Sequence, residues 1–313
     1  MKHFLILLLA LLAAPLLPAQ EKSPAKPDRR RVKPDMHEGI IQEPHIMFTY
    51  VDEKKRRRLT LDLYLPDGNK GPYPAIVMFF GGGWQNGRPG IFAGLAQALT
   101  QRGYVCVVPA YRLSGEKPFP AAVHDGKAAI RWTRRNAKTF NIDSKRIASM
   151  GGSAGGHLAG FMAATNGIKR FEGKGDHRDF SSDVQSAIVM CGPMSLLLPH
   201  VIERVEKAAG KPEGDAIIDF MGGALPAQKT GIYIEASPLT HLSPRTPPML
   251  FIDGEFDRPR TRYTESWSKM DKLGIPHEFV MMPKAPHPFW NMRQWFIPTV
   301  DAIDNFLQKH LPE

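Results

Sequence analysis

The sequence predicts an α/β domain built on a mostly parallel, doubly wound sheet, with an N-terminal antiparallel hairpin and a small cap insertion. From residue 74 onward, apolar runs such as PAIVMFF (74–80) and YVCVVPA (104–110) alternate with segments whose apolar residues recur at helical spacing. Unbroken apolar runs are typical of parallel strands that are buried on both faces of a sheet. The repeated strand–helix–strand order implies right-handed crossovers, which produce a doubly wound sheet.

The predicted hairpin precedes this repeat. Residues 45–51 and 59–65 are both strand-like, and TLDLYLP (60–66) alternates between apolar and polar residues as a half-buried strand does. The basic cluster KKRRR at 54–58 lies between the two runs, which indicates a solvated hairpin tip.

The remaining elements follow in chain order. Helices are expected at 90–103, at 119–140, directly after Ser153, at 263–273 and at 290–311, and strands at 146–150, 186–192, 247–254 and 276–283. Residues 192–243 interrupt this rhythm with scattered short helical pieces, prolines and glycines, and they contain no strong strand. An excursion of this size between two core strands predicts a cap over the active site.

The N-terminal part of the chain predicts export. Residues 1–19 have a short basic start, an apolar run and a small residue, Ala19, at the cleavage point, as in a secretory signal peptide. This run is too short and too interrupted by proline for a good membrane span, and no other run is apolar enough to cross a bilayer. Residues 20–44 are rich in proline and charge, so we expect a flexible leader before a domain at 45–313. The prediction is a secreted or periplasmic protein without stable membrane insertion.

The charge balance argues against one class of partner. The chain has 41 Lys and Arg against 31 Asp and Glu, a formal net charge of +10. The basic residues are scattered, and no aromatic–basic platform or recognition helix accompanies them, so a nucleic acid is not expected as a partner. Attraction to an anionic polysaccharide or to a membrane surface stays open.

The two cysteines, Cys106 and Cys191, lie in runs that look like buried strands. In an exported protein, two cysteines are compatible with a disulfide. Central strands also bury free cysteine as a small hydrophobic residue, and we therefore expect two free, unreactive thiols.

The stretch KRIASMGGSAGGHLA (145–159) combines a short apolar strand, an abrupt glycine turn and the start of a helix. It contains the pattern G-x-S-x-G, with Ser153 at its centre. A serine on a tight strand-to-helix turn adopts strained backbone geometry and needs small neighbours on both sides. The strain lifts its hydroxyl above the sheet edge, at the positive end of the following helix. Ser153 is therefore the candidate nucleophile.

A serine nucleophile needs a general base and an orienting acid, because its hydroxyl is unreactive at neutral pH. His287 follows the last predicted strand, so it lies at the carboxyl edge of the sheet, where chemistry takes place on this architecture. His277 begins that strand and would lie at the wrong edge, and His157 is expected to pack locally. For the acid, Asp257 lies far enough beyond its strand to curl back toward a histidine, and Asp253, at the strand end, is the alternative.

Glycines after the first parallel strand provide candidate oxyanion donors. In the run FGGGW (80–84), three glycines allow backbone N–H groups to approach a substrate oxygen without an intervening Cβ. The amide of Ala154, directly after the nucleophile, is a further donor. The run lacks the G-K-[ST] ending of a P-loop, so nucleotide binding is not indicated.

These motifs together resemble those of the α/β-hydrolases of the esterase/lipase branch. The chain is similar to the bacterial carbohydrate-esterase-like group often labelled BD-FAE or hormone-sensitive-lipase-like, over about residues 45–310. The matching stretches are GGGW (81–84), PAYRLS (109–114), FPAAVHDGKAAIRW (119–132), IDSKRIASMGGSAGGHLA (142–159), ASPLTHLSPRTPPML (236–250), DGEFD (253–257) and PHPFW (286–290). The block around Ser153 is the most specific of these.

The resemblance implies an α/β-hydrolase fold and a serine esterase that needs no metal or organic cofactor. Together with export, it implies esters met outside the cytoplasm, such as acetyl or feruloyl esters on plant polysaccharide. The site residues that it implies are the triad Ser153, Asp257 and His287 and the oxyanion-hole amides of Gly82, Gly83 and Ala154.

Two residues depart from the family pattern. Phe80 stands where the family usually has a histidine that orders the oxyanion loop, which puts the rigidity of the loop and the substrate range in doubt. Asp253 replaces the histidine of a usual histidine–glycine pair and places an extra carboxylate near the presumed acid. That carboxylate is expected either to perturb the pKa of Asp257 or His287, or to cap the turn.

We therefore expect a secreted serine esterase that acts through an acyl-enzyme on a small-molecule or polysaccharide ester. One alternative is a serine peptidase of the prolyl-oligopeptidase type, which shares the triad but usually has a large N-terminal propeller. Another is a non-catalytic binding protein with a hydrolase fold, an interpretation that Phe80 makes plausible. Trp84 and Trp290 are weaker candidates for lining the pocket, since aromatic residues are more often core.

Overall fold

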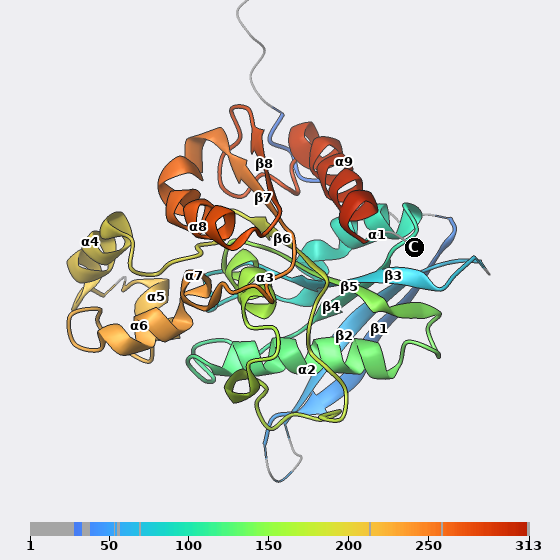
Figure 1. The fold of residues 1–313 in the computed structure, drawn as a ribbon, viewed down its shortest axis with the longest axis horizontal. Coiled ribbons are helices and arrows are strands. Elements are labelled where there is room, and N and C mark those ends of the chain that lie inside the picture. The colour runs from blue at the N-terminus through green and yellow to red at the C-terminus, as the bar shows by residue number, and fades with distance from the viewer. Residues whose placement is uncertain are drawn as a thin grey trace, which may run out of the picture.

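The computed structural model describes residues 28–32, 38–52, 54, 57–68, 70–212, 214–257 and 259–311. It contains an eight-stranded sheet with the strand order β1-β2-β4-β3-β5-β6-β7-β8 (Figure 1). The strands are β1 (Ile40–Tyr50), β2 (Arg58–Pro66), β3 (Tyr73–Phe79), β4 (Val105–Pro109), β5 (Ile142–Gly152), β6 (Ser186–Met190), β7 (Met249–Gly254) and β8 (His277–Met282). The predicted fold class is confirmed.

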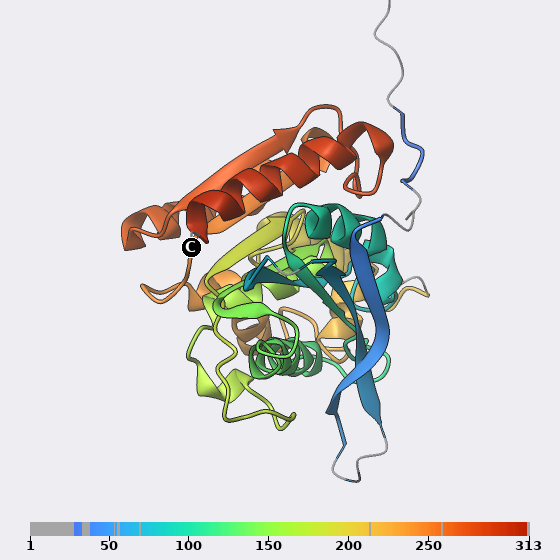
Figure 2. The same ribbon diagram turned by 90° about the vertical axis from the view of Figure 1, so that its right-hand side faces the viewer.

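Helices cover both faces of this sheet. The α-helices are α1 (Ala93–Gln101), α2 (Ala121–Arg135), α3 (Ala154–Ala164), α4 (Pro199–Ala208), α5 (Ala216–Phe220), α6 (Thr230–Ala236), α7 (Pro238–His241), α8 (Pro259–Leu273) and α9 (Arg293–His310). Short 3-10 helices are η1 (Pro89–Phe92), η2 (Lys169–Phe171) and η3 (Glu255–Asp257). Helices α1 and α9 pack together, while α3 packs against α2 and α7. Figure 2 shows the β1–β2 hairpin at one edge of the sheet and β8 with α9 at the other.

Strand directions place a topological switch beside Ser153. Strand β2 runs antiparallel to β1 and β4, and all pairs from β4 to β8 are parallel. From β3, the chain moves to β4 on one side, whereas β5 lies on the other side. The ends of β3 and β5 are in register, with Phe79 opposite Gly151. The loops that follow these two strands therefore meet at the carboxyl edge, where ligands bind in sheets of this kind.

The N-terminal boundary differs from the expectation. Strand β1 begins at Ile40, before the expected domain start at residue 45. Part of the expected leader is also ordered by backbone hydrogen bonds, because Val32 N donates to Asn291 O (2.8 Å) and Arg293 N donates to Arg30 O (2.9 Å). The leader therefore pairs with the segment before α9 over residues 28–32. The predicted signal peptide at 1–19 lies outside the described residues, and no helix in the described part of the chain is long and apolar enough to span a bilayer.

The segment at 192–243 contains α4 to α7 and lies between β6 and β7, as predicted for an insertion. Figure 1 shows α4, α5 and α6 together at one side of the domain. Aromatic packing joins this insertion to the loop after β3, since Phe220 of α5 stacks on Trp84 with ring centroids 4.4 Å apart. Both cysteines are free and buried, as expected.

Candidate active site

Ser153 lies at the turn between β5 and α3, with φ 57° and ψ −122°. Residues other than glycine rarely adopt a positive φ, and such strain is concentrated at functional sites. The strained turn is held from the neighbouring strand, because Ser153 N donates to Met190 O (2.8 Å). The Ser153 side chain remains partly accessible, although every residue of α3 is buried.

Close backbone packing explains the glycines around this serine. A Cβ on Gly151 would overlap the carbonyl group of Gly155, and a Cβ on Gly155 would overlap the carbonyl group of Phe79 at the end of β3. Helix α3 therefore begins almost in contact with the two central strands. Only glycine at these two positions allows the turn to be so tight.

The structure brings the three predicted triad side chains together. His287 Nε2 lies 3.0 Å from Ser153 Oγ, and His287 Nδ1 lies 2.7 Å from Asp257 Oδ2. With Nδ1–H donating to the carboxylate, Nε2 is the unprotonated nitrogen and accepts the serine hydroxyl. Asp257 ends η3, and His287 follows β8, so both side chains reach the carboxyl edge as expected.

The two candidate acids have different surroundings. Asp257 faces His287, and its side chain is 18% exposed, whereas Asp253 is fully buried inside the end of β7. Burial raises the pKa of Asp257, but the hydrogen bond from His287 and the charge of Arg262 outweigh this effect and hold that pKa well below its usual range. Burial raises the pKa of Asp253 to about 6. The geometry therefore favours Asp257 as the partner of His287.

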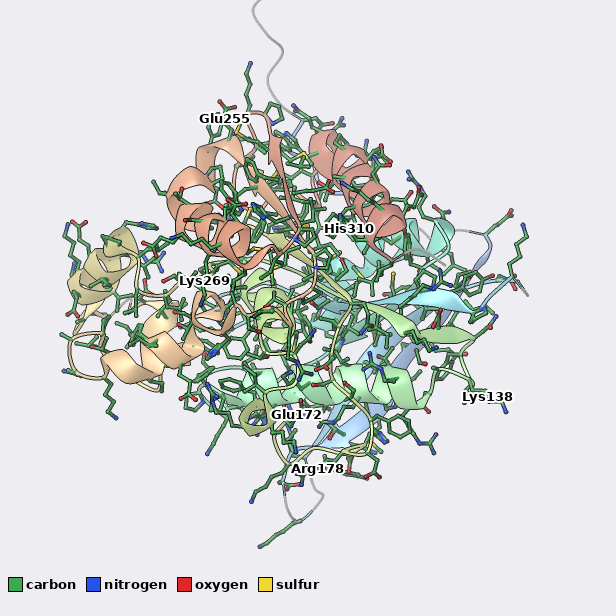
Figure 3. All side chains as sticks on the ribbon, viewed as in Figure 1. Lys138, Glu172, Arg178, Glu255, Lys269 and His310 are labelled. Carbon is green, nitrogen blue, oxygen red and sulfur yellow. The ribbon has the colours of Figure 1, made fainter. Side chains whose placement is uncertain are left out.

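Hydrogen bonds connect the loop of the acid to the loop of the base. Glu255 Oε2 accepts a bond from Lys284 N (2.8 Å), and Phe256 N donates to Ala285 O (3.3 Å). Figure 3 shows Glu255 at the end of the domain where β7 and β8 finish. These contacts hold η3 beside the segment that leads to His287, so Asp257 and His287 are positioned relative to each other by the backbone as well as by their own hydrogen bond.

The predicted oxyanion donors lie beside Ser153. Gly82 and Gly83 follow β3, and Ala154 is the first residue of α3, where a helix has unpaired N–H groups. No hydrogen bond to another described residue occupies the amides of these three residues. Gly82 O accepts bonds from Gln85 N (3.1 Å) and Asn86 N (3.0 Å), which fixes the loop as a tight turn.

Phe80, the departure at the start of this loop, is part of the core. Its ring stacks on Tyr111 with centroids 4.3 Å apart, and the Tyr111 hydroxyl donates to Phe80 O at 2.8 Å. The aromatic pair thus anchors the loop where the family usually has a histidine. Tyr111 lies in the matching stretch PAYRLS (109–114), and its anchoring role was not predicted from the sequence.

Two cavities of about 380 Å³ each meet at Ser153 and His287. The first is lined by Trp84 and by residues of the insertion, among them Leu198, Val201, Arg204, Ala216 and Ile217. The second is lined by the three loop glycines and by Arg31, Ile91, Pro288, Trp290, Asn291 and Met292. Both predicted tryptophans line a cavity while remaining largely buried. A larger cavity of about 760 Å³ lies around Tyr73 and Arg102, and none of the described residues that line it is a serine, cysteine or histidine.

The remaining candidates have structural environments. His157 is fully buried, with Nε2 2.7 Å from Ala236 O, and His277 begins β8, far from the carboxyl edge.

One group of side chains among the described residues could be considered for a metal, because the ligand atoms of Cys191, Asp257 and His287 lie within 4.8 Å of one another. The aspartate and histidine are bonded to each other, however, and the buried thiol has a pKa well above its usual range. This group therefore offers no set of free donors for a metal.

Sequence reasoning missed Arg262. Its Nη2 lies 2.8 Å from Asp257 Oδ1, and its side chain is only 17% exposed. Arg262 belongs to the run RPRTR at 258–262, and a run rich in arginine does not indicate which side chain turns inward. The only signal would have been the helical phase of α8, which determines which of its side chains face Asp257 in η3.

Comparison with known proteins adds the family. The BD-FAE profile matches residues 61–270 of the chain. A probable carboxylic ester hydrolase of Mycobacterium tuberculosis, LipM, is 29% identical over 208 residues, which cover 64% of this chain and 44% of LipM. The chain spans less than half of the length of LipM and of other curated relatives such as the esterase LipC.

Solved structures show the same fold. A truncated carbohydrate esterase from gut microbiota has a TM-score of 0.73 at 24% identity, and the match covers 87% of this chain and 97% of that one. The thermophilic esterase Est2 of Thermogutta terrifontis has a TM-score of 0.66 at 27% identity, with coverage of 85% and 92%. Because the BD-FAE profile spans more than half of the sequence, the chain belongs to the BD-FAE family.

Proposed function

We propose that the protein is a serine esterase that hydrolyses carboxylic esters through an acyl-enzyme. The observation that carries this proposal is the hydrogen-bonded chain from Ser153 through His287 to Asp257, with distances of 3.0 and 2.7 Å. Nucleophile, base and orienting acid within hydrogen-bond reach of one another are the arrangement that acyl transfer requires. The esterases among its relatives support the same reaction class.

Each residue has a defined role in the proposed reaction. The Ser153 oxygen attacks the ester carbonyl while His287 Nε2 takes its proton and then delivers it to the leaving alcohol. Asp257 orients the ring and stabilises the imidazolium that forms. The amides of Gly82, Gly83 and Ala154 bind the developing oxyanion, and a water molecule then releases the acyl group by the same proton transfers.

We propose short acyl or feruloyl esters on carbohydrate as the substrate. Ser153 lies between two cavities of about 380 Å³, so an ester placed at Ser153 has room on both sides of its carbonyl. The carbohydrate part of the proposal is supported by the description of the gut microbial structure as a carbohydrate esterase. The signal-peptide pattern at 1–19 supports a secreted or periplasmic location, where such polymers are met.

Fluorophosphonate labelling of the mature protein tests this function. We expect labelling of the wild type, loss of labelling in Ser153→Ala, and faster hydrolysis of 4-nitrophenyl acetate than of long-chain esters. Ser149→Ala is a matched control, because Ser149 is a buried serine of the same strand whose hydroxyl bonds to Ala159 O (3.0 Å), and it should label normally.

Two other outcomes would favour the alternatives. A folded wild-type protein that does not label would favour a non-catalytic binding protein. Labelling combined with cleavage of a peptide anilide in preference to an acetyl ester would favour a serine peptidase.

A further inference from the structure

The second departure from the family pattern, Asp253, lies behind the acid of the triad. Its Oδ1 accepts bonds from Gly254 N (2.8 Å) and from the Cys191 thiol (3.0 Å). Its Oδ2 lies 3.3 Å from Arg262 Nη1, an ion-pair distance without the alignment of a hydrogen bond. The carboxylate is fully buried, so its charge needs the partners that surround it.

Arg262 joins this buried carboxylate to Asp257. Its Nη2 lies 2.8 Å from Asp257 Oδ1 and also donates to the main-chain oxygen of Asp257 at 3.1 Å. The other carboxylate oxygen of Asp257 is the one that faces His287. A planar guanidinium that holds one oxygen and the backbone of the same residue fixes the rotation of that carboxylate.

Helix α8, which carries Arg262, is itself anchored. Figure 3 shows Lys269 where α8 passes α7, and Lys269 Nζ donates to the carbonyl oxygens of Leu239 (2.8 Å) and Thr240 (3.1 Å). The guanidinium is therefore held by a fixed helix and is not carried on a mobile loop.

Arg262 alone would have an electrostatic cost for the proposed reaction. A cation beside Asp257 cancels the negative charge that stabilises the imidazolium of His287. With Asp253 ionised, the group of Asp253, Arg262 and Asp257 has a net charge of −1, the charge of a single triad aspartate. With Asp253 neutral, the net charge is zero.

We propose that Arg262 and Asp253 are positioning residues, in which Arg262 clamps the carboxylate of Asp257 and Asp253 supplies the negative charge that compensates the guanidinium. This inference rests on the proposed serine esterase function. It gives the aspartate at position 253 a role that a histidine, the usual residue at that position, would not fill.

The surroundings of Asp253 make this compensation dependent on pH. The titratable and charged groups that face it are Cys191 after β6, Asp257 in η3, and Arg262 and Tyr263 on α8. Burial raises the pKa of Asp253 to about 6, so its ionised form dominates at neutral and alkaline pH and is lost in mild acid.

The test is the pH dependence of kcat/KM for 4-nitrophenyl acetate in Asp253→Asn and in the double variant Asp253→Asn/Arg262→Gln. In Asp253→Asn, the net charge becomes zero and the imidazolium is less stable, so the acid limb moves to lower pH by roughly 0.5 to 1 unit. In the double variant, only Asp257 remains charged and the net charge is −1 throughout the limb, so the limb moves back at least to its wild-type position. The plateau stays about tenfold or more below wild type, because the clamp is lost.

If Asp253 and Arg262 had a merely structural role, adding Arg262→Gln to Asp253→Asn would not restore the pH profile. An acid limb that does not move in Asp253→Asn, or that stays displaced in the double variant, overturns the proposal. If Asp253→Asn does not fold, Asp253→His replaces it and should move the limb in the same direction. Wild-type protein without esterase activity would instead refute the proposed function, so the two failures are distinguishable.

Asp304→Asn is the matched control. Asp304 is a buried carboxylate held by Arg102 (2.8 Å) and by the Tyr104 hydroxyl (2.8 Å), next to the amino end of β4 and so at the opposite edge of the sheet. Its loss should reduce thermal stability and leave the position of the acid limb unchanged.

Discussion

The two sides of Ser153 are held by different forces. On the side of the acid and base, charged and hydrogen-bonded groups fix the geometry, with Asp257 between His287 (2.7 Å) and Arg262 (2.8 Å). On the side of the oxyanion loop, aromatic packing fixes it, with Phe80 stacked on Tyr111 at a centroid distance of 4.3 Å. The first side depends on ionisation and the second on shape. Changes on the first side should therefore alter pH profiles, and changes on the second should lower rates at every pH.

The largest expected effect comes from the charged side. Asp257→Asn should lower kcat about 10⁴-fold, because the amide no longer holds the imidazole in the tautomer that accepts the serine proton. Steady-state kinetics and a thermal melt measure activity and folding separately. Asp253→Asn is the comparison, and a smaller loss in Asp257→Asn than in Asp253→Asn would assign the role of the acid to Asp253.

The corresponding change on the packed side is Gly82→Ala. Gly82 has φ +127°, and a Cβ there would overlap the backbone of Asn86, so the turn must shift. We expect kcat to fall roughly 10²- to 10³-fold, the effect of a lost oxyanion donor, with an unchanged acid limb. Gly90→Ala is the control, because a Cβ at Gly90 would meet no atom within 4 Å. An effect confined to KM would exclude Gly82 from the oxyanion hole.

His157 is a titratable residue on the packed side, and its ionisation should affect the free energy of unfolding. It is fully buried, its ring is nearly perpendicular to the stacked rings of Trp84 and Phe220, and burial lowers its pKa from 6.5 to about 4. Between these two pH values the unfolded chain binds a proton that the folded protein does not. The free energy of unfolding should therefore fall by roughly 2 kcal/mol between pH 7 and pH 4.5 because of this residue. Urea denaturation at both pH values measures it, and His157→Gln should have a shallower pH dependence. An equal slope in the variant would contradict this assignment.

The same contrast explains what the sequence could predict. Backbone demands leave local signals, so the glycines around Ser153, the run at 81–83 and the alternation of strands and helices were sufficient to predict the fold and the strained turn at Ser153. The position of Asp257 and His287 near Ser153 followed from chain order, since the carboxyl ends of the strands share one edge of the sheet. Arg262 and the stacking of Phe80 on Tyr111 were beyond reach, because each depends on how elements distant in sequence turn toward each other.

The smallest expected effect concerns the leader, whose placement sequence reasoning missed. Arg31 pairs with Met292 through a backbone bridge and lines the second cavity with Trp290. A long side chain at a cavity wall contributes contact area and hydrogen-bond donors to a bulky ester, and it reaches a small ester less. Arg31→Ala should therefore raise KM for methyl ferulate roughly two- to tenfold and affect 4-nitrophenyl acetate less. Arg29→Ala is the control, because Arg29 is exposed in the same segment and does not line the cavity. Equal effects of the two substitutions on methyl ferulate would show that Arg31 does not contact large esters, which would favour their binding in the cavity that α4 and α5 help to line.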